Sequence, residues 1–276
     1  MIKTLVQLSD PHIKLPGARA YGRVDTAQFL RQAVQAVRRL RQAPTAVVVT
    51  GDLTDFGRPD EYAHLRELLQ PIDCPLYLMP GNHDDREALR DSFPAHGYLR
   101  NGTPFIQYAI DLGGLRLVAV DTVVPRASHG EVCAARVDQL AQLLAQDTVT
   151  PTVVAMHHPP FRTMIGHMDE IGLRGADGAL AALIARHPQV RRVICGHLHR
   201  AICAPWAGTL AMTAPSTAHQ VTLDLAPDAP SAFSMEPPGF LVHAWSDSGE
   251  VVSHVASVGP FEGPFPFHED DGQLID

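Results

Sequence analysis

The chain has 276 residues, 45% of them hydrophobic and 19% charged, and a formal net charge of -8 at pH 7. This composition supports a full hydrophobic core and excludes a disordered chain, while the scattered lysines and arginines exclude the basic footprint of a protein that binds duplex nucleic acid. Its apolar runs are shorter than the about 18 residues that span a bilayer and its start lacks a signal-peptide pattern, so we expect a cytoplasmic protein without membrane contact.

Six short apolar runs rich in Val, Ile and Leu are predicted to be buried strands. They cover residues 4–8, 46–50, 76–79, 115–120, 152–156 and 192–195. Between the first two runs, apolar residues from Leu30 to Leu40 share one face and Asp25 precedes them as a plausible N-cap, which predicts an amphipathic helix. Similar helices are expected over about 60–69, 137–144 and 178–186. Because strands and helices alternate, the sequence predicts an α/β fold with a largely parallel core.

The pattern changes after residue 199, where strands joined by turns are expected to form a second sheet. They cover residues 201–206, 209–213, 239–245 and 251–258. The segment of about 215–238 is rich in Pro, Ala, Ser and Asp and is predicted to be an excursion over the mouth of the site, as a lid or a subunit contact; a solvated loop without a role is the open alternative. Residues 259–276 are expected to be an extended tail packed on the surface, which leaves one domain over 1–276.

Five clusters of metal-ligand residue types directly follow predicted strands. They are Asp10-Pro-His12, Gly51-Asp52, Gly81-Asn82-His83-Asp84, His157-His158-Pro159 and Gly196-His197-Leu198-His199. In an α/β sheet the strands fix positions and the loops expose side chains, so reactive groups collect at strand ends. Imidazole and carboxylate ligands suit Fe, Zn, Mn or Co, whereas calcium and magnesium prefer oxygen alone. The clusters therefore predict a site for two divalent transition-metal ions.

The charges of these clusters suit an anionic substrate. Two dications carry about four positive charges and only Asp10 and Asp52 among the predicted ligands are anionic, so about two charges remain to polarise a phosphoryl oxygen and acidify a bound water. Asp52 can bridge two ions through its two oxygens, and the neutral amide of Asn82 preserves Lewis acidity. An acidic protein can thus still bind a small phosphorylated molecule.

The order of the clusters resembles the calcineurin-like metallophosphoesterase superfamily, whose pattern is D-x-H, G-D, G-N-H-[DE], H-x-P and G-H-x-H. The match extends from Ser9 to His199. Several longer stretches are similar to the bacterial glycerophosphodiesterase branch, which is related to the class III cyclic-nucleotide phosphodiesterases. These stretches are 9–12, 21–25, 57–62, 75–85, 156–160 and Met168-Asp169.

The resemblance implies a four-layer αββα sandwich, two mixed sheets flanked by helices, with a small cap and a binuclear centre. The implied ligands are Asp10, His12, Asp52 and His199 for the first metal, and Asp52, Asn82, His157 and His197 for the second. His83 would face the phosphoryl group. The chain departs from the branch in its four cysteines, which have no C-x-x-C spacing and place no disulfide between cap and core; most are expected to be small buried hydrophobes. A homo-oligomer, dimer or higher, stays open.

The sequence therefore predicts a phosphodiesterase that hydrolyses glycerophosphodiesters or 3′,5′-cyclic nucleotides by in-line attack of a metal-bound hydroxide, with Asp52 and His83 as catalytic residues. His83 would stabilise the equatorial oxygens, protonate the leaving group or, alternatively, orient a metal ligand. Candidate substrate contacts, each with a plain structural alternative, are His83, His158, Tyr21, Arg162, His219 and His167. A phosphomonoesterase or nuclease with the same centre stays open, as does a non-catalytic scaffold, although a scaffold should have lost ligands and all seven are present.

Overall fold

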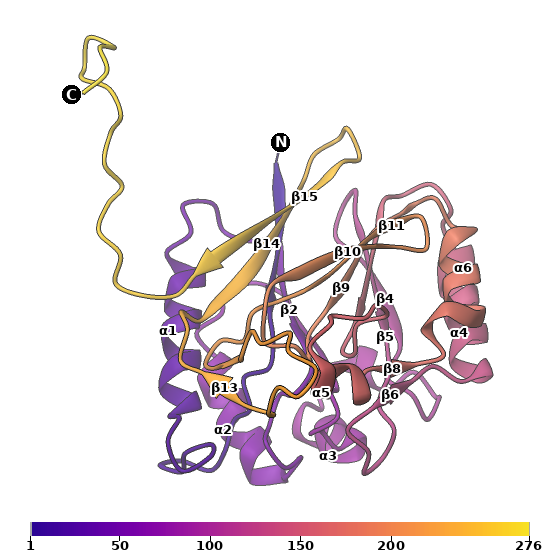
Figure 1. Ribbon diagram of the computed structural model, residues 1–276. Helices are drawn as coiled ribbons and strands as arrows, with labels where there is room; N and C mark the ends of the chain where they lie inside the picture. The colour runs from indigo at the N-terminus through magenta and orange to yellow at the C-terminus, as the bar shows by residue number, and fades with distance from the viewer. Residues whose placement is uncertain (1, 276) are drawn as a thin grey trace.

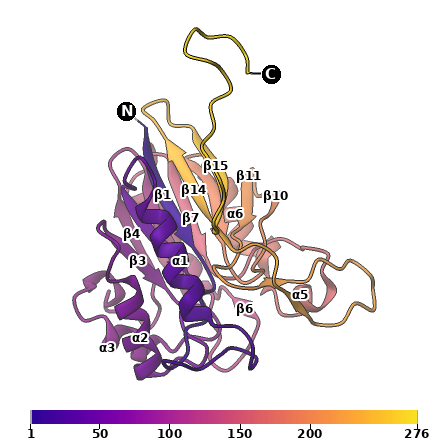
Figure 2. The same cartoon turned by 90° about the vertical axis from the view of Figure 1, so that its left-hand side faces the viewer.

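The computed structural model describes residues 2–275 of the chain. Two mixed β-sheets pack against each other in the middle of the molecule, and helices cover the outer face of each sheet (Figure 1, Figure 2). The four-layer αββα sandwich expected from the sequence is confirmed. No helix among the described residues is long and apolar enough to cross a membrane.

The two sheets have five and six strands. In spatial order the first contains β15 (Val251–Ser257), β14 (Gly239–Trp245), β1 (Lys3–Leu8), β2 (Ala46–Thr50) and β3 (Leu76–Met79). The second contains β10 (Ile202–Trp206), β11 (Thr209–Thr213), β9 (Val190–Cys195), β7 (Thr152–Met156), β5 (Arg116–Val120) and β4 (Tyr108–Asp111). Two short pairs lie outside the sheets: β6 (Gly130–Glu131) with β8 (Leu173–Arg174), and β12 (Gln220–Val221) with β13 (Phe233–Ser234).

Six α-helices surround these sheets in the described part of the chain. They are α1 (Thr26–Arg38), α2 (Pro59–Leu69), α3 (Arg86–Ser92), α4 (Ala134–Ala145), α5 (Gly166–Glu170) and α6 (Ala181–Ala185). The Asp25 carboxylate accepts a hydrogen bond from the Gln28 amide at 2.9 Å, which confirms the predicted N-cap of α1. The helix expected over 178–186 is α-helical only from Ala181, because Gly178 has a non-helical φ of -92° and ψ of -126°. A 3₁₀ turn covers Gly97–Leu99.

Strand residues alternate between two apolar layers. Val6 and Val47 point toward α1 and α2, where they pack with Leu30, whereas Leu5 and Val48 point between the two sheets. Because β2 and β7 are buried along their whole length, each consists mostly of apolar residues. This is why the short apolar runs of the sequence identify the strands.

The expectation that the strands after residue 199 form a second sheet of their own is wrong. The first six predicted strands already divide between the two sheets, and the later ones extend both. β14 pairs antiparallel with β1, while β11 pairs parallel with β9 and antiparallel with β10. Apolar patterning shows that a segment is a strand but carries no information on which distant strand it pairs with, because packing sets the partner.

Two smaller expectations also need correction. The tail is extended, but residues 259–275 are exposed and project away from the domain instead of packing on it (Figure 1). Its prolines remove ladder donors, and its glycines, which lack a side chain to pack, weaken a strand. All four cysteines are free, yet only Cys195 is buried; Cys74 and Cys133 are partly exposed and Cys203 is exposed.

Replacing Leu30 tests the packing of α1 on the first sheet. We expect Leu30→Ala to lower the free energy of unfolding by about 2–5 kcal/mol, because it leaves a cavity beneath the helix. Urea denaturation followed by circular dichroism measures the change. Arg31→Ala, at an exposed position of the same helix, should change it by less than about 0.5 kcal/mol. Equal effects of the two substitutions would contradict this packing.

Candidate metal centre

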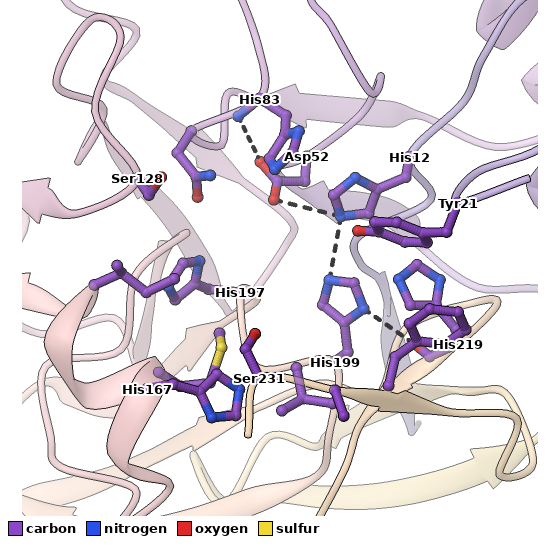
Figure 3. Close-up of a pocket in the computed structure, with 16 residues that line it drawn as sticks. His12, Tyr21, Asp52, His83, Ser128, His167, His197, His199, His219 and Ser231 are labelled. Atoms are coloured by element: carbon purple, nitrogen blue, oxygen red, sulfur yellow. Dashed lines mark hydrogen bonds and ion pairs between the residues drawn. The ribbon is translucent and has the colours of Figure 1, made fainter. Parts of the chain in front are cut away.

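The predicted ligands from both sheets meet at one edge of the sandwich. Asp10 and Asp52 follow β1 and β2 of the first sheet, whereas His157 follows β7 and His197 and His199 follow β9 of the second. Figure 3 shows Asp52, His12 and His199 directed toward one another, with His83 and His197 beside them. Parallel strands of both sheets end at this edge, so side chains distant in sequence converge there.

The backbone around the centre is strained. Five of the seven predicted ligands have a positive φ, and these are Asp10, His12, Asp52, His197 and His199, with values from 44° to 70°. Non-glycine residues rarely adopt this left-handed region, and such strain concentrates at functional sites. Hydrogen bonds hold the turns in place: the His12 amide donates to the Asp52 carbonyl at 2.9 Å, and the His197 amide donates to the Asp10 carboxylate at 2.9 Å. The strained turns direct the side chains inward.

The ligand set expected for the first metal is assembled in the structure. One ligand atom from each of Asp10, His12, Asp52 and His199 lies within 4.8 Å of all the others. The Nε2 atoms of His12 and His199 are 3.1 Å apart, and His12 Nε2 lies 3.5 Å from an oxygen of Asp52. Four buried nitrogen and oxygen ligand atoms therefore surround one point.

Neighbouring acceptors fix which ring nitrogen of three of the histidines faces the centre. Nδ1 of His157 donates to the Thr50 carbonyl at 2.9 Å, and Nδ1 of His199 donates to the His219 carbonyl at 3.0 Å. A carbonyl oxygen only accepts hydrogen bonds, so Nδ1 carries the proton and Nε2 presents its lone pair to the centre. Nδ1 of His12 lies 3.3 Å from the Asp55 carboxylate and is oriented in the same way. Such partners are typical of metal-binding histidines.

Asp52 lies between the two predicted ligand sets. One of its oxygens is 3.5 Å from Nε2 of His12 and 3.4 Å from Nε2 of His157. Nε2 of His157 is in turn 3.1 Å from the side-chain oxygen of Asn82. The same carboxylate oxygen therefore contacts a histidine of each set, which is the position that a bridging ligand requires.

The residues at this edge fit a pair of metal ions. Oδ2 of Asp10 and Nε2 of His197 are buried and lack a hydrogen-bond partner among the described residues. An unsatisfied buried polar atom costs about 1–3 kcal/mol, so each of these atoms calls for a ligand. One belongs to each predicted set, and the mixture of imidazole, carboxylate and amide donors suits transition metals.

Burial favours the neutral form of both the imidazole and the carboxyl ligands. Burial lowers the pKa of His199 to about 3 and that of His197 well below its usual range, so both are neutral at pH 7 and can coordinate. Burial raises the pKa of the Asp10 carboxyl to about 6. At His157 burial opposes the charged form, yet the nearby Asp52 carboxylate raises the pKa to about 9. A cation in the centre favours the ionised carboxylates and the neutral imidazoles.

Two carboxylates that the sequence analysis gave no role hold the ligand loops together. Asp84 accepts hydrogen bonds from the amides of Gly81 at 2.8 Å and Leu53 at 3.0 Å and from the Tyr62 hydroxyl at 2.8 Å. It thereby joins the loop after β2 to the loop after β3. Burial, together with repulsion from Asp52, raises the pKa of Asp84 to about 6. Its signal was visible as the last residue of the Gly-Asn-His-Asp run.

The second of these carboxylates, Asp55, has only its closeness to Asp52 in the sequence as a signal. It orients His12 and pairs with the ammonium group of Lys14 at 2.6 Å.

Position 81 requires glycine, because a Cβ there would collide with the amide and carboxylate of Asp52. The two ligand loops can approach closely only because position 81 has no side chain.

His83 is fixed beside the centre and remains partly exposed. Its amide donates to Asp52 Oδ1 at 2.9 Å, and its Nδ1 donates to the Asp55 carbonyl at 2.8 Å. Its ring contacts that of His12 edge-on, with 4.7 Å between centroids. Two hydrogen bonds thus set the orientation of the ring, whose edge lines the adjoining cavity.

That cavity has a volume of about 370 Å³, at the small end of the range for small-molecule sites. Four of the candidate substrate contacts line it, and these are Tyr21, His83, His167 and His219 (Figure 3). It also has a wall that the sequence analysis missed, formed by Ser128, Met168, Ser231 and Phe233 among others. Much of this wall comes from the segment of about 215–238.

Two candidate substrate contacts do not line the cavity. Both ring nitrogens of His158 already have partners, the Thr122 hydroxyl at 2.8 Å and the Ser128 carbonyl at 3.1 Å, so this buried side chain supports the loop that carries Ser128. The Arg162 side chain is 86% exposed and lies 3.5 Å from the Asp169 carboxylate. Neither partner of this ion pair, which no sequence pattern indicated, lines the cavity.

Comparison with known proteins places this arrangement among metal-dependent phosphoesterases. Residues 3–201 match the family model described as calcineurin-like phosphoesterase. A probable glycerophosphodiester phosphodiesterase of Arcobacter nitrofigilis is 35% identical over 272 residues, which are 99% of each chain. A probable cyclic nucleotide phosphodiesterase of Rhodopseudomonas palustris is 35% identical over 268 residues, 96% of each chain.

A solved structure with a similar fold is the purple acid phosphatase from yellow lupin seeds. The TM-score is 0.67 at 15% sequence identity, and the match covers all of this chain and 53% of that one. The present chain thus spans about half the length of that phosphatase. This comparison shows that the two proteins share a fold.

Removing the shared carboxylate tests the two-metal arrangement. We expect Asp52→Asn, purified and reconstituted with Mn²⁺ or Zn²⁺, to retain fewer than one metal ion per chain, because the substitution removes the negative charge that contacts both sets. Elemental analysis after gel filtration gives the occupancy. Asp73→Asn, at an exposed carboxylate outside the centre, should bind metal like the unmodified protein. An Asp52 variant with two tightly bound metals would contradict the arrangement.

Replacing Asp84 tests its role in joining the two loops. We expect Asp84→Ala to lower the free energy of unfolding by at least about 3 kcal/mol, because several buried donors lose their acceptor. Tyr62→Phe removes only one of these hydrogen bonds and should cost about 1 kcal/mol. Urea denaturation measures both changes. The two variants having the same stability would contradict this role.

Proposed function

The chain belongs to the calcineurin-like phosphoesterase family, and from this membership we propose that it is a binuclear metal-dependent phosphodiesterase for small phosphodiesters. The proposed substrates are glycerophosphodiesters or 3′,5′-cyclic nucleotides, in keeping with the names of its relatives. The observation that carries the proposal is the buried Asp52 oxygen within 3.5 Å of Nε2 atoms of both His12 and His157, next to a cavity of small-molecule size.

Each ligand has a separate part in the proposed reaction. When bound, two divalent transition metals supply Lewis acidity toward a phosphoryl oxygen and lower the pKa of a water molecule. Asp52 would be a ligand that both sites share, while the amide of Asn82 would add a donor without cancelling positive charge. The native pair is proposed to be drawn from Fe, Mn, Zn and Co, because the same nitrogen and oxygen ligands accept each of them.

His83 is proposed to act on the phosphoryl group. Because its Nδ1 donates to the Asp55 carbonyl, its Nε2 is the nitrogen left for the substrate. In the protonated form Nε2 donates to an equatorial phosphoryl oxygen, or passes its proton to the departing alkoxide. The fixed ring needs no reorganisation during the reaction, which is how a positioned acid lowers a barrier.

The lining of the cavity favours a diester over a monoester. No lysine or arginine is among the described residues that line it, and Asp52 is its one carboxylate. A diester carries a single negative charge, which the surplus charge of two metals can balance, whereas a monoester dianion usually needs further cations. A non-catalytic scaffold is disfavoured because all seven predicted ligands are retained. A cytoplasmic location and a homo-oligomer remain predictions from the sequence.

A substrate panel tests the proposed activity. We expect the protein reconstituted with Mn, Zn, Fe or Co to hydrolyse glycerophosphoethanolamine or cyclic AMP faster than simple phosphomonoesters, because the centre and cavity suit a monoanion. Release of the product alcohol or nucleotide, followed by chromatography, measures the rates. Monoester hydrolysis as the dominant activity, or no hydrolysis with any metal, would overturn the proposal.

A second experiment separates metal binding from catalysis. His83→Ala should keep its metals but lose kcat by about 10²–10⁴-fold, because the residue acts on the substrate and not on the metals. Kinetics and elemental analysis on the same preparation give both values. His254→Ala, at an exposed position on β15, serves as the control and should be unaffected. Full kcat in the His83 variant would exclude this role.

A further inference from the structure

One side of the cavity is formed by three aromatic rings in mutual contact. We call Tyr21, His219 and Phe233 the aromatic wall; their ring centroids lie 4.9 to 5.3 Å apart. The wall adjoins the first ligand set, since the His219 ring lies 4.7 Å from that of His199 and 5.7 Å from that of His12 (Figure 3). A group attached to a phosphate at the centre is therefore within reach of the wall.

The wall is anchored firmly to the metal centre. Phe233 on β13 is paired with Val221 on β12, and its ring packs against a small buried cluster around Val24. The guanidinium group of Arg200, the residue after His199, donates to the Val221 carbonyl at 2.8 Å and pairs with Glu236 at 2.8 Å. Both short strands of the segment are thus tied to the strand end that carries the ligands.

Tyr21 and Gly22 occupy the two central positions of a tight turn that the Arg23 amide closes by donating to the Ala20 carbonyl at 3.0 Å, and such a turn requires a positive φ at both positions. Tyr21 has a φ of 52°, and its side chain contacts the rings of Phe233 and His219 although the residue is 60% exposed. A turn at this position would be more stable with glycine or asparagine, because a left-handed aromatic residue is strained. A large aromatic ring at a turn position that glycine or asparagine would fill more easily, and that lines the cavity, is well placed to contact a ligand.

The chemistry of the lining restricts what the wall can bind. The described lining residues include no lysine, arginine or glutamate, and the single carboxylate, Asp52, belongs to the metal centre. A charged group on the organic part of a substrate would find no counterion there. The rings of the wall touch one another and so leave no space for an ammonium group between them, as an aromatic cage would. The three residues line the cavity with ring surface that suits a flat, uncharged group.

We propose that the aromatic wall binds a planar, uncharged ring of the phosphodiester, such as a nucleobase, and that Phe233 determines this specificity. The inference rests on the proposed function and narrows its substrate class to ring-bearing diesters, in preference to those of charged aminoalcohols. Stacking of a base on an aromatic side chain changes affinity by about five- to 150-fold. Loss of the Phe233 ring should therefore weaken the binding of a ring-bearing diester by a factor within this range.

Kinetics with two diesters test the proposal. Cyclic AMP carries a planar base, whereas glycerophosphoethanolamine carries an ammonium group, and both are cleaved at a phosphodiester. Phe233→Leu keeps an apolar side chain but removes the ring. We expect it to lower the ratio of kcat/KM for cyclic AMP to that for glycerophosphoethanolamine by about tenfold, mainly through KM for cyclic AMP. Phe233→Tyr, which retains a ring, should keep the ratio close to that of the unmodified protein.

Matched controls separate the wall from general effects. Phe267→Leu replaces an aromatic residue of the tail that is 81% exposed, and it should leave both diesters unaffected. Calorimetric titration with adenosine, which has no phosphate, measures the wall directly, and the affinity should fall by a similar factor in Phe233→Leu. This readout does not require turnover.

The outcomes distinguish this inference from the proposed function. Suppose that the unmodified protein hydrolyses both diesters. If Phe233→Leu then lowers kcat/KM for both by the same factor, or changes it for neither, the assignment of the wall is wrong while the phosphodiesterase activity stands. If no diester is hydrolysed, the proposed function fails. In that case the calorimetric titration still tests the aromatic wall. If adenosine binds the unmodified protein and Phe233→Leu with equal affinity, or binds neither, the assignment of the wall is wrong.

Discussion

The buried carboxylate of Asp52 is the group on which the rest of the site depends. It lies where the two sheets meet, and one of its oxygens contacts a histidine from each of them. An isolated charge at such a depth is costly, so the fold must provide cations or hydrogen-bond donors around it. The inward-facing lone pairs of the histidines, the unpartnered atoms of Asp10 and His197 and the strained turns all follow from gathering metal ligands around one carboxylate.

A second layer of interactions makes this gathering possible. Carbonyl groups of Thr50 and His219 select the histidine tautomers that leave Nε2 free, and Asp84 holds together the loops after β2 and β3. This arrangement buries charged groups and strains the backbone, and both effects destabilise the fold. The packed strands on either side supply the stability that compensates for them. The apolar sandwich therefore serves as the rigid support for a polar edge that would not be stable by itself.

The segment between β11 and β14 connects this support to substrate choice. Its first residues are hydrogen-bonded to the ligand turns, for example from the Ser216 hydroxyl to the Asp10 carbonyl at 2.9 Å, and its later residues line the cavity. The metal centre accounts for the proposed reaction class, whereas this segment supplies part of the lining of the adjoining cavity.

The sequence by itself predicted most strands of the two sheets, the candidate ligand residues and the reaction class, because buried strands are rich in apolar residues and metal ligands need particular side chains directly after them. Tertiary structure alone decided which strands pair, that Asp55 and Asp84 support the ligands, that His158 and Arg162 lie outside the cavity, and that Phe233 lines it. These features depend on contacts between segments far apart in the chain. Packing and burial set such contacts, and no local pattern of residues encodes them.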